Sequence, residues 1–495
     1  MNVLFVCSEA TPFAKTGGLA EVAGVLPRHL AARGHDVRLV MPRYASVPRD
    51  TLTPVAGLAS VAVPFGHYGV VTVEVLAGVI PGSDVPVWFV DHPPTFGREG
   101  LYVDPATGHG YSDNAARFAL LSRAALEVAR AADLAPDVVH VHDWHTAVVP
   151  VMLNTVYRDD PRLGRAASVL TIHNMQHQGW ADKGLIDLLG VGWGEFTHLS
   201  LEAWDQVNLL KGGLYHATLV NTVSPRYARE IATPAFGHGL DGVVRDRGGD
   251  CRGILNGCDY DVWDPATDRY LPARYDADDL SGKAACKEAL QRELGLEVRA
   301  DVPVLAVVSR LAEQKGLDVL LAALPRVLGL GVQVALLGSG ERWLEDAFIG
   351  ASLAHPGRVG VRIGYDEQLA HRIEAGGDLF VMPSRFEPCG LNQMYSLAYG
   401  TPPIVAAVGG LDDTVTSYHE STDSGTGFKL HDLSPGALFD TIAWAVWALR
   451  ERPEAFGRLQ RRGMAERFTW ERAARAYEDL YGEAVARRVG RERRA

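Results

Sequence analysis

The sequence DLFVMPSRFEPCGLNQMYSLAYG, residues 378–400, decides the fold of this chain. The apolar run at residues 379–382 predicts a buried strand, and the pattern after Gly390 predicts a helix. A charged loop, residues 385–389, joins the two at the carboxyl end of the strand. Open α/β sheets bind ligands at that end, and a helix start points free backbone N–H groups into the loop. The stretch predicts either a ligand site or an ordinary strand–helix turn in which Arg385 and Glu387 form a solvated pair.

This strand is one of five that alternate with helices in the second half of the chain. The alternation implies a parallel sheet with right-handed crossovers, so the loop that carries Arg310 and Lys315 opens on the same edge as Glu387. Arg310 offers a planar fork for phosphate and Lys315 a movable point charge. The two cations favour an anionic ligand, with a solvated pair as the alternative. The apolar runs lie at residues 302–308, 332–337, 359–363, 379–382 and 403–408. The helical patterns lie at residues 317–328, from Gly340 to about residue 354, and at 366–375.

The first half begins with a strand–helix–strand unit at residues 3–6, 19–33 and 37–41. Its loop contains Lys15, Gly17 and Gly18 but no GxGxxG fingerprint. The two glycines permit a bound group to approach the backbone at the helix start, and the Lys15 ammonium could reach a phosphate there. A flexible loop with a solvated lysine is the alternative.

Two further strands of the first half end in histidines. The strand predicted at residues 137–145 carries His140, His142 and His145, and the strand at residues 167–172 is followed by His173. Their spacing matches no zinc pattern, and no carboxylate ligand is specified. We therefore predict no metal site.

Composition limits the class of protein. A chain of 495 residues predicts two or three domains. Its net charge of −12 argues against a nucleic acid or an anionic membrane as partner. The five cysteines form no CxxC pair, no signal-peptide pattern is seen, and no apolar run reaches the length of a membrane span. We expect a cytoplasmic protein.

Seven motifs in order along residues 1–470 together resemble those of bacterial glycogen synthases and plant starch synthases. The resemblance implies an α/β fold of the GT-B type, with two Rossmann-like doubly wound domains facing a central cleft. It places an acceptor-side domain at residues 1–255, with a C-terminal helix at 470–490 crossing back to it, and a donor-nucleotide-binding domain at 256–469. The motifs are KTGGLAEV (15–22), HVHDWH (140–145), TIHNMQHQG (171–179), ILNGCD (254–259), VVSRLAEQKG (307–316), GYDE (364–367) and PSRFEPCGLNQ (383–393).

The resemblance implies transfer of glucose from ADP-glucose to the non-reducing 4-hydroxyl of an α-1,4-glucan such as glycogen. It implies retention at the anomeric carbon and no cofactor. As catalytic residues it implies Glu387 to position the glucose, His173 to bond the 6-hydroxyl, Arg310 and Lys315 to hold the leaving diphosphate, and Asp143 to line the sugar.

The same resemblance implies a set of substrate-binding residues. Lys15, Gly17 and Gly18 would contact the phosphates of the donor. The others would be Asn174 on the acceptor side, Asn256 and Gln314 at the sugar or nucleotide, Tyr365 on the adenine, and the backbone N–H groups of Cys389, Gly390 and Leu391 at the glucose.

The chain departs from the family pattern at three positions: Glu21 stands where Asp is common, His177 where Tyr is common, and Asn392 where Thr is common. Two other functions compete. One is a transferase of the same fold that uses a UDP-sugar, but many of these carry a second glutamate where this chain has Tyr395. The other is a catalytically silent glucan-binding protein, against which the intact Lys15, Arg310, Lys315 and Glu387 argue.

Overall fold

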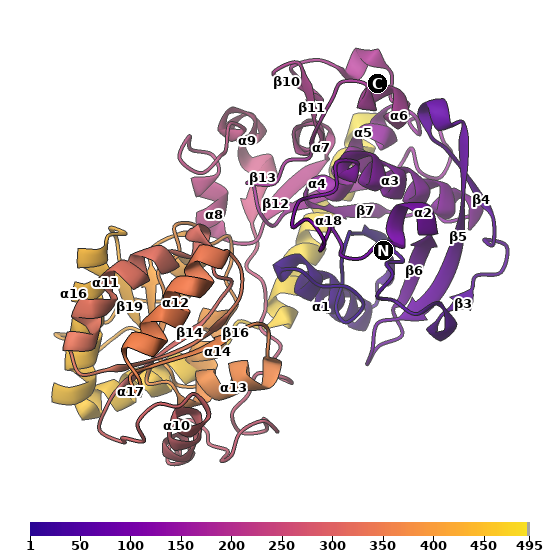
Figure 1. Cartoon of the computed structure of the whole chain (residues 1–495). Helices are drawn as coiled ribbons and strands as arrows, with labels where there is room; N and C mark the ends of the chain where they lie inside the picture. Colours follow the sequence, from indigo (N-terminus) through magenta and orange to yellow (C-terminus); the bar gives the residue numbers. More distant parts are fainter. Residues whose placement is uncertain (493–495) are drawn as a thin grey trace. The chain divides into compact units, whose positions relative to one another are not determined.

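The computed structural model describes residues 1–492, which divide into two compact units. The first unit comprises residues 1–223, 228–254 and the segment from residue 470 onward, and the second comprises residues 224–227 and 255–469. The boundaries fall at α8 (Pro225–Glu230), between Ile254 and Leu255, and between Thr469 and Trp470. In Figure 1 the first unit runs from indigo to magenta and ends with the yellow helix α18, and the second is mainly orange.

The first unit is built on a sheet that has ten strands within residues 1–492. Seven neighbouring strands, in the order β13-β12-β8-β7-β1-β2-β6, are parallel, and β5, β3 and β4 extend the sheet with antiparallel pairs. A separate antiparallel sheet has the order β10-β11-β9. The strands are β1 (Asn2–Val6), β2 (Asp36–Pro42), β3 (Thr53–Pro54), β4 (Val61–Pro64), β5 (Val70–Val79), β6 (Pro86–Asp91), β7 (Val138–His142), β8 (Ala167–Ile172), β9 (Trp180–Ala181), β10 (Glu202–Ala203), β11 (Gln206–Asn208), β12 (Leu219–Thr222) and β13 (Cys251–Gly253).

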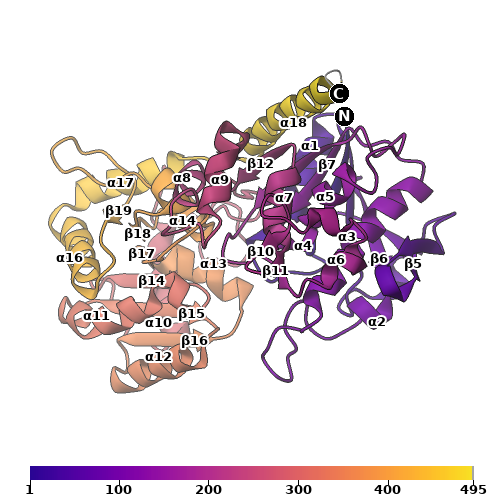
Figure 2. The same ribbon diagram turned by 90° about the horizontal axis from the view of Figure 1, so that it is seen from above.

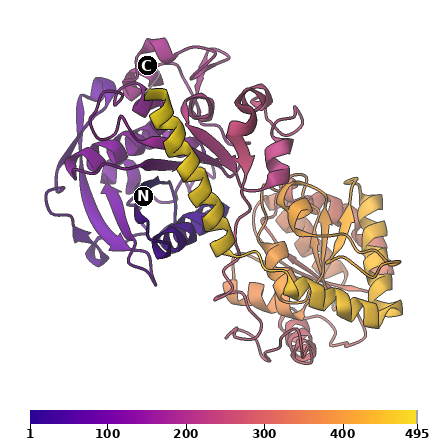
Figure 3. The same ribbon diagram turned by 180° about the vertical axis from the view of Figure 1, so that it is seen from behind.

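Helices cover both faces of the main sheet of the first unit. On one face α18 lies beside α1 and crosses β7 and β8 (Figures 2 and 3). On the other face α3 packs with α4 and α5 (Figure 1). Pro27 lies inside α1 without ending it. The helices are α1 (Gly18–Ala32), α2 (Pro93–Phe96), α3 (Asn114–Ala131), α4 (Asp143–Thr146), α5 (Val148–Asn154), α6 (Leu185–Leu189), α7 (Leu209–His216), α9 (Asp241–Arg247) and α18 (Trp470–Glu492).

The second unit is built on a parallel sheet in the order β16-β15-β14-β17-β18-β19. Its central strand β14 is buried on both faces: Leu305 and Val307 belong to one core cluster, whereas Val304 and Ala306 belong to another. The strands are β14 (Val304–Val308), β15 (Gln333–Gly338), β16 (Val359–Ile363), β17 (Leu379–Met382), β18 (Pro403–Ala406) and β19 (Phe428–Leu430); the helices are α10 (Gly282–Glu293), α11 (Leu317–Gly329), α12 (Arg342–Ala354), α13 (Glu367–Gly376), α14 (Asn392–Ala398), α15 (Gly409–Thr414), α16 (Pro435–Glu451) and α17 (Pro453–Ala465).

The predicted parallel α/β alternation is present in the second unit, but the prediction of five strands was one short. The strand that it missed, β19, has three residues and pairs with the edge of β18, so its apolar pattern is too short to be read from the sequence. No helix among the described residues is long and apolar enough to cross a lipid bilayer.

Candidate functional site

Two loops of the second unit meet at the carboxyl ends of neighbouring strands. The loop after β14 carries Lys315, and the loop after β17 carries Glu387. Lys315 Nζ lies 2.5 Å from Glu387 Oε2, with the Lys315 side chain 17% exposed and that of Glu387 7% exposed. Ser384 Oγ also donates to Glu387 Oε2, at 3.1 Å. Glu387 is thus held by a cation and a hydroxyl in a nearly buried position.

Close backbone contact fixes the two loops against each other. Gly316 has φ +65°, and a Cβ there would lie 1.8 Å from the carbonyl oxygen of Pro383. Two further hydrogen bonds cross between the loops: Arg385 N donates to Gln314 O at 2.9 Å, and Gln314 Nε2 donates to Phe386 O at 3.3 Å. Only glycine fits the position beside Lys315, because it alone avoids both the strain and the clash.

Arginines of these loops have different partners. Arg310 is exposed, and its Nη2 donates to Gln314 Oε1 at 3.0 Å. Arg385 forms a two-pronged pair with Asp318 of α11, at 2.6 Å for each contact. The predicted alternative of a solvated Arg385–Glu387 pair is therefore wrong, because Asp318 takes the guanidinium and leaves Glu387 to Lys315.

The turn that follows Glu387 leads into α14. Gly390 has φ +72°, and Gln393 Nε2 donates to the carbonyl oxygens of Cys389 and Gly390 at 3.1 and 3.0 Å. Leu391 is the residue directly before α14, so its backbone N–H lies at the start of that helix. Asn392 Nδ2 donates to Val308 O at 2.6 Å and ties the turn to the end of β14.

Burial makes the Cys389 thiol unreactive. It raises the pKa of this thiol to about 12, and a backbone hydrogen bond from Asn256 offsets part of the rise. A thiol with this pKa is protonated at neutral pH and is a poor nucleophile. Asn256 itself is 4% exposed, and its side-chain Oδ1 is buried with no hydrogen-bond partner in the described part of the chain. Such an acceptor fits contact with a donor group of a ligand.

Tyr365 lies beyond the end of β16, on the same sheet but two strands away from β14. Its side chain is 77% exposed, and Gly364 before it has φ +125°. An exposed aromatic face at the carboxyl edge of a parallel sheet can stack on a planar ring.

In the first unit, Asp143, His173 and Asn174 lie together at the ends of β7 and β8. Asp143 has φ +53°, and its Oδ1 accepts from the backbone N–H groups of His173 at 2.6 Å and Asn174 at 3.3 Å. Burial raises the pKa of Asp143 to about 7, against the effect of these two hydrogen bonds. A non-glycine residue in the left-handed region is strained, and here it holds a carboxylate beneath the loop that carries His173.

The imidazole of His173 faces a second histidine. His142 Nδ1 lies 3.0 Å from His173 Nε2, and His142 Nε2 is buried with no partner among the described residues. Burial lowers the pKa of His173 to about 3 and that of His142 well below its usual value. Both rings are therefore neutral at physiological pH. In their shared hydrogen bond one ring donates and the other accepts, so the tautomer of His173 is coupled to that of His142.

A buried hydrogen-bond network joins the ends of these strands to α18. Tyr481 OH lies 2.7 Å from His140 Nδ1, and His140 Nε2 lies 2.7 Å from Thr171 Oγ1. Thr171 Oγ1 donates to Asn221 at 2.7 Å, and Asn221 donates to Tyr477 OH at 3.0 Å. Within residues 1–492, no three His, Cys, Asp or Glu side chains gather as they would around a metal ion.

The Lys15 loop follows β1, which is the neighbour of β7. Lys15 forms an ion pair with Glu21 of α1. Glycine at Gly17 and Gly18 is required neither by φ nor by packing, because a Cβ at either position would meet nothing within 4 Å. This open space fits a group that approaches the backbone from outside the chain.

Sequence reasoning missed the roles of three residues of the site. Glu9 is 3% exposed and accepts from Thr16 N at 2.5 Å and Thr16 Oγ1 at 2.9 Å, which shapes the Lys15 loop; burial raises its pKa. Its place just after β1 was the available signal. Asp318 was not singled out, and His142 was considered only as a metal ligand, because their roles depend on which strands and helices are neighbours.

The structure brings most predicted residues together within their own units. Lys315 with Glu387, Arg310 with Gln314, and Cys389 with Asn256 are in contact in the second unit, and Asp143 contacts the backbone of His173 and Asn174 in the first. Lys15 belongs to the first unit and the other two cations to the second. Their meeting around one ligand stays a prediction.

Comparison with known proteins places the chain among relatives that match nearly all of it. The model of the starch synthase catalytic domain matches residues 2–246, and that of glycosyl transferases group 1 matches residues 295–458. Glycogen synthase 1 of Geobacter metallireducens is 54% identical, and the match covers 99% of this chain and 97% of that protein. A glycogen synthase of Anaeromyxobacter sp. is 51% identical, with 98% of this chain and 100% of that protein covered.

Two solved structures share the fold. The catalytic domain of starch synthase IV from Arabidopsis thaliana, bound to ADP and acarbose, superposes with a TM-score of 0.89 at 32% identity, covering 98% of this chain and 99% of the other. Sucrose-phosphate synthase from Thermosynechococcus elongatus superposes with a TM-score of 0.61 at 18% identity, covering 98% and 99%. The predicted α/β fold of the GT-B class is confirmed.

Proposed function

Because the chain belongs to the glycogen synthase family of glycosyltransferases, we propose that it transfers glucose from ADP-glucose to the non-reducing 4-hydroxyl of an α-1,4-glucan with retention at the anomeric carbon. The family membership confirms the relationship predicted from the seven motifs. The donor, the acceptor position and the stereochemistry are our proposals.

The Lys315–Glu387 pair is the observation that carries the proposal. It sets a cation for phosphate beside a carboxylate for the sugar, 2.5 Å apart at the carboxyl edge of one sheet. Arg310, in the same loop as Lys315, adds a second cation that can turn toward a diphosphate because its side chain is exposed. In a nucleotide sugar the negative phosphates are bonded directly to the hexose. A cation beside a carboxylate therefore matches the ligand, with the cation at the phosphates and the carboxylate at the hexose.

The reaction breaks the bond between C1 of glucose and the diphosphate oxygen, and forms a bond between C1 and O4 of the acceptor. Negative charge grows on the diphosphate, where Arg310 and Lys315 stabilise it, and positive charge grows on the sugar near Glu387. Lys15, from the loop with the open Gly17 and Gly18, would supply a third positive charge. His173 is neutral because its pKa is about 3, so it acts as a hydrogen-bond partner for the 6-hydroxyl rather than as a cation.

We propose front-face displacement, in which the acceptor's 4-hydroxyl proton passes to the leaving diphosphate oxygen. Retention by double displacement requires a nucleophilic carboxylate close to a second, acidic one. Glu387 is instead bonded to Lys315 and Ser384, which suits a positioning role. Isolation of a covalent glucosyl–Glu387 adduct would overturn the front-face mechanism.

We propose ADP-glucose rather than UDP-glucose because the starch synthase IV relative is bound to ADP. Tyr365 offers an aromatic face, 77% exposed, on which the adenine can stack. The test is to mix the protein with glycogen and either donor, and to measure nucleoside diphosphate release together with incorporation of labelled glucose. Release of ADP with incorporation supports the proposal. Faster UDP release would identify a UDP-sugar transferase, and binding of glycogen without release would identify a silent glucan-binding protein.

The compartment is a further proposal. All five cysteines are unpaired, which is typical of a reducing environment, and we place the enzyme in the cytoplasm.

A further inference from the structure

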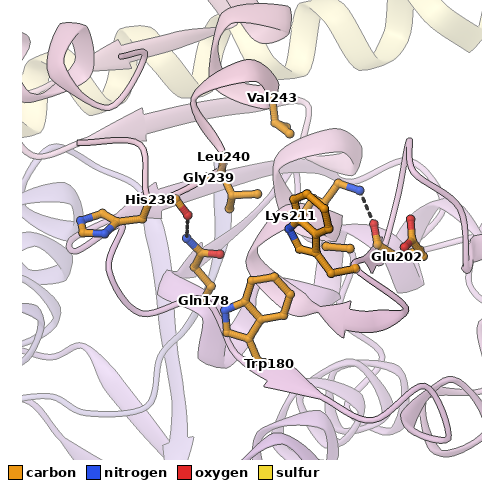
Figure 4. Close-up of a pocket in the computed structure, with 10 residues that line it drawn as sticks. Gln178, Trp180, Glu202, Lys211, His238, Gly239, Leu240 and Val243 are labelled. Atoms are coloured by element: carbon orange, nitrogen blue, oxygen red, sulfur yellow. Dashed lines mark hydrogen bonds between the residues drawn. The ribbon is translucent and has the colours of Figure 1, made fainter. Parts of the chain in front are cut away.

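A cavity of about 180 Å³ lies in the first unit and is lined by none of the residues assigned to the reaction. Its walls come from the segment after β8, the hairpin β10–β11, α7 and the segment that leads into α9. Figure 4 shows Trp180, Gln178, Lys211 and Glu202 around the space, with Leu240 and Val243 beyond them. Two tryptophans in its lining are exposed: Trp180 by 45% and Trp204 by 89%.

The conformation of Trp204 has no explanation within the fold. Glu202 pairs with Val207 and Ala203 with Gln206, so Trp204 and Asp205 form a two-residue hairpin loop. Both have positive φ, +56° and +59°, as a type I′ turn requires, and such turns favour Asn or Asp followed by Gly. A bulky side chain is strained there, and an indole that is 89% exposed gains almost no burial in return.

The hairpin tip is nevertheless held firmly. Asp205 N donates to Glu202 Oε1 at 3.0 Å, and Lys183 Nζ contacts both carboxylate oxygens of Asp205 at 3.1 and 2.9 Å. Lys211 Nζ donates to the carbonyl oxygen of Glu202, as Figure 4 shows. Trp204 is therefore presented at a fixed place on the rim of the cavity. Strain retained in a well-anchored exposed aromatic residue points to a binding role.

The chemistry of the cavity suits a hexose. Each pyranose ring has apolar faces of C–H groups, which stack on indole rings, and a rim of hydroxyls, which need hydrogen-bond partners. Beside the two indoles stand the amide of Gln178 and the charged groups of Glu202 and Lys211. Burial lowers the pKa of Lys211, but the ammonium already bonds to the chain at Glu202, so an anionic ligand is less suited than a neutral polar one.

The size of the cavity favours an elongated ligand. Pockets that enclose a whole small molecule have volumes of roughly 300–1,000 Å³, and this cavity has about 180 Å³. The ligand must therefore lie partly outside, across the rim where Trp204 stands. A polymer of glucose satisfies this condition, whereas a free monosaccharide would leave Trp204 without a partner.

The loop that carries His173 also forms part of the wall of the cavity. Gln178 follows His173 by five residues, and its Nε2 donates to Met175 O at 3.2 Å and to His238 O at 2.9 Å. Gly179, with φ +70°, packs against Trp144, because a Cβ there would lie 2.4 Å from that ring. One rigid loop therefore carries His173 at one end and the wall of the cavity at the other.

We propose that Trp180 and Trp204 bind a segment of the α-1,4-glucan acceptor that lies away from its reacting end. This inference rests on the proposed function for the identity of the chain that is bound. The cavity is then a glucan subsite that raises the affinity for long acceptors and takes no part in the transfer itself.

The test uses Trp204→Asn, which places the preferred turn residue at the strained position. Calorimetric titration with maltoheptaose should show binding weakened at least fivefold, while the melting temperature stays the same or rises because the strain is relieved. The KM for glycogen should rise with kcat unchanged, and turnover of maltose, which offers only two glucose units, should not change. Trp193→Ala is the matched control, because Trp193 is 52% exposed in the same unit but does not line the cavity.

Trp180→Ala provides the second variant and should weaken binding to a similar degree. Should Trp204→Asn lower the melting temperature, Trp204→Phe, which keeps the aromatic face, must restore binding. Wild-type affinity in both Trp204→Asn and Trp180→Ala, or equal losses with maltose and glycogen, would overturn the subsite. Absence of ADP release by the wild-type protein would instead refute the proposed function, and the maltoheptaose titration would still report on the cavity.

Discussion

Lys315 Nζ lies 2.5 Å from Glu387 Oε2, so the cation proposed for the leaving diphosphate and the carboxylate proposed for the glucose are bonded to each other. Breaking a largely buried ion pair by removing one partner leaves an uncompensated charge, and this is costly. A diphosphate that arrives at Lys315 would compete with Glu387 for the same ammonium. The pair therefore couples binding of the phosphates to the freedom of the carboxylate that faces the sugar.

This coupling predicts opposite effects of Glu387→Gln on binding and on turnover. The amide oxygen can still accept from Lys315 and Ser384, so the fold should be kept. ADP should bind several-fold more tightly, because Lys315 loses its anionic competitor, whereas kcat should fall at least 100-fold, because the carboxylate near the developing positive charge is gone. Titration calorimetry and steady-state kinetics check the two effects. Weaker ADP binding would show that Glu387 does not compete for Lys315.

Replacement of Arg310 separates transition-state stabilisation from donor binding. Arg310→Ala should lower kcat by about 100-fold, in the range seen when one group that stabilises developing charge is removed, while the KM for ADP-glucose changes less. Arg342→Ala is the control, because the Arg342 side chain is 92% exposed on α12 of the same unit. Near-normal kcat in Arg310→Ala would remove Arg310 from the reaction.

Asp143 predicts a pH dependence of stability. Burial raises its pKa in the folded chain from the usual 3.8 to about 7. Below pH 4 both folded and unfolded chains hold the proton, and no stability is lost. Between pH 4 and 7 the unfolded chain releases the proton while the folded chain keeps it, so stability falls as pH rises, by up to about 4 kcal/mol above pH 7.

Asp143→Asn should remove this dependence. The amide oxygen can still accept from the backbone of His173 and Asn174, so the gain in stability over the wild type should be larger at pH 8 than at pH 4. Urea unfolding at both pH values measures the difference. Relief of strain at φ +53° adds an increment that is the same at both pH values, so only the change with pH reports the carboxyl group. An equal gain at pH 4 and pH 8 would refute the raised pKa.

Much of this site could be predicted from the sequence because parallel sheets gather the carboxyl ends of their strands. The apolar runs of β14 and β17 predicted both strands, and the loops that follow them carry Arg310, Lys315 and Glu387. The placement of these loops on one sheet edge required no knowledge of side-chain contacts. The same reasoning applies to Asp143 and His173, which follow β7 and β8.

Pairings between side chains could not be predicted in the same way. Arg385 bonds to Asp318, 67 positions away, because α11 packs beside the loop after β17. The contact of His142 with His173 depends on β7 and β8 being neighbours, which the apolar pattern of each strand does not reveal. Trp204 was not selected from the sequence because its strain depends on a hairpin with strands of two and three residues.

The hydrogen bond between His142 and His173 leads us to expect that replacing His142 lowers kcat, which a purely structural role would not do. The His142 ring packs against those of Phe5 and His140, with centroids 4.3 and 4.2 Å away, so His142→Phe keeps the packing but loses the hydrogen bond to His173. We expect kcat to fall about tenfold, the size of effect that a loss of one orienting bond of about 1.4 kcal/mol produces, with a smaller change in the KM for ADP-glucose. Tyr481→Phe, which removes a bond to the neighbouring His140, should lower the melting temperature and leave kcat near normal. A comparable loss of kcat in both variants would assign His142 to the structural network alone.

Two glycines predict opposite outcomes for the same substitution. Gly316→Ala forces a Cβ to within 1.8 Å of Pro383 O at φ +65°, so the loops must separate, Lys315 must leave Glu387, and stability should fall by about 3 kcal/mol or more. Gly17→Ala meets nothing within 4 Å in an extended backbone, so the melting temperature should not change. Its methyl group would nevertheless stand where we place the donor phosphates, and the KM for ADP-glucose should rise about tenfold. Thermal melts and donor titrations of the two variants give the comparison. Normal donor kinetics in Gly17→Ala would show that the phosphates do not bind at the Lys15 loop.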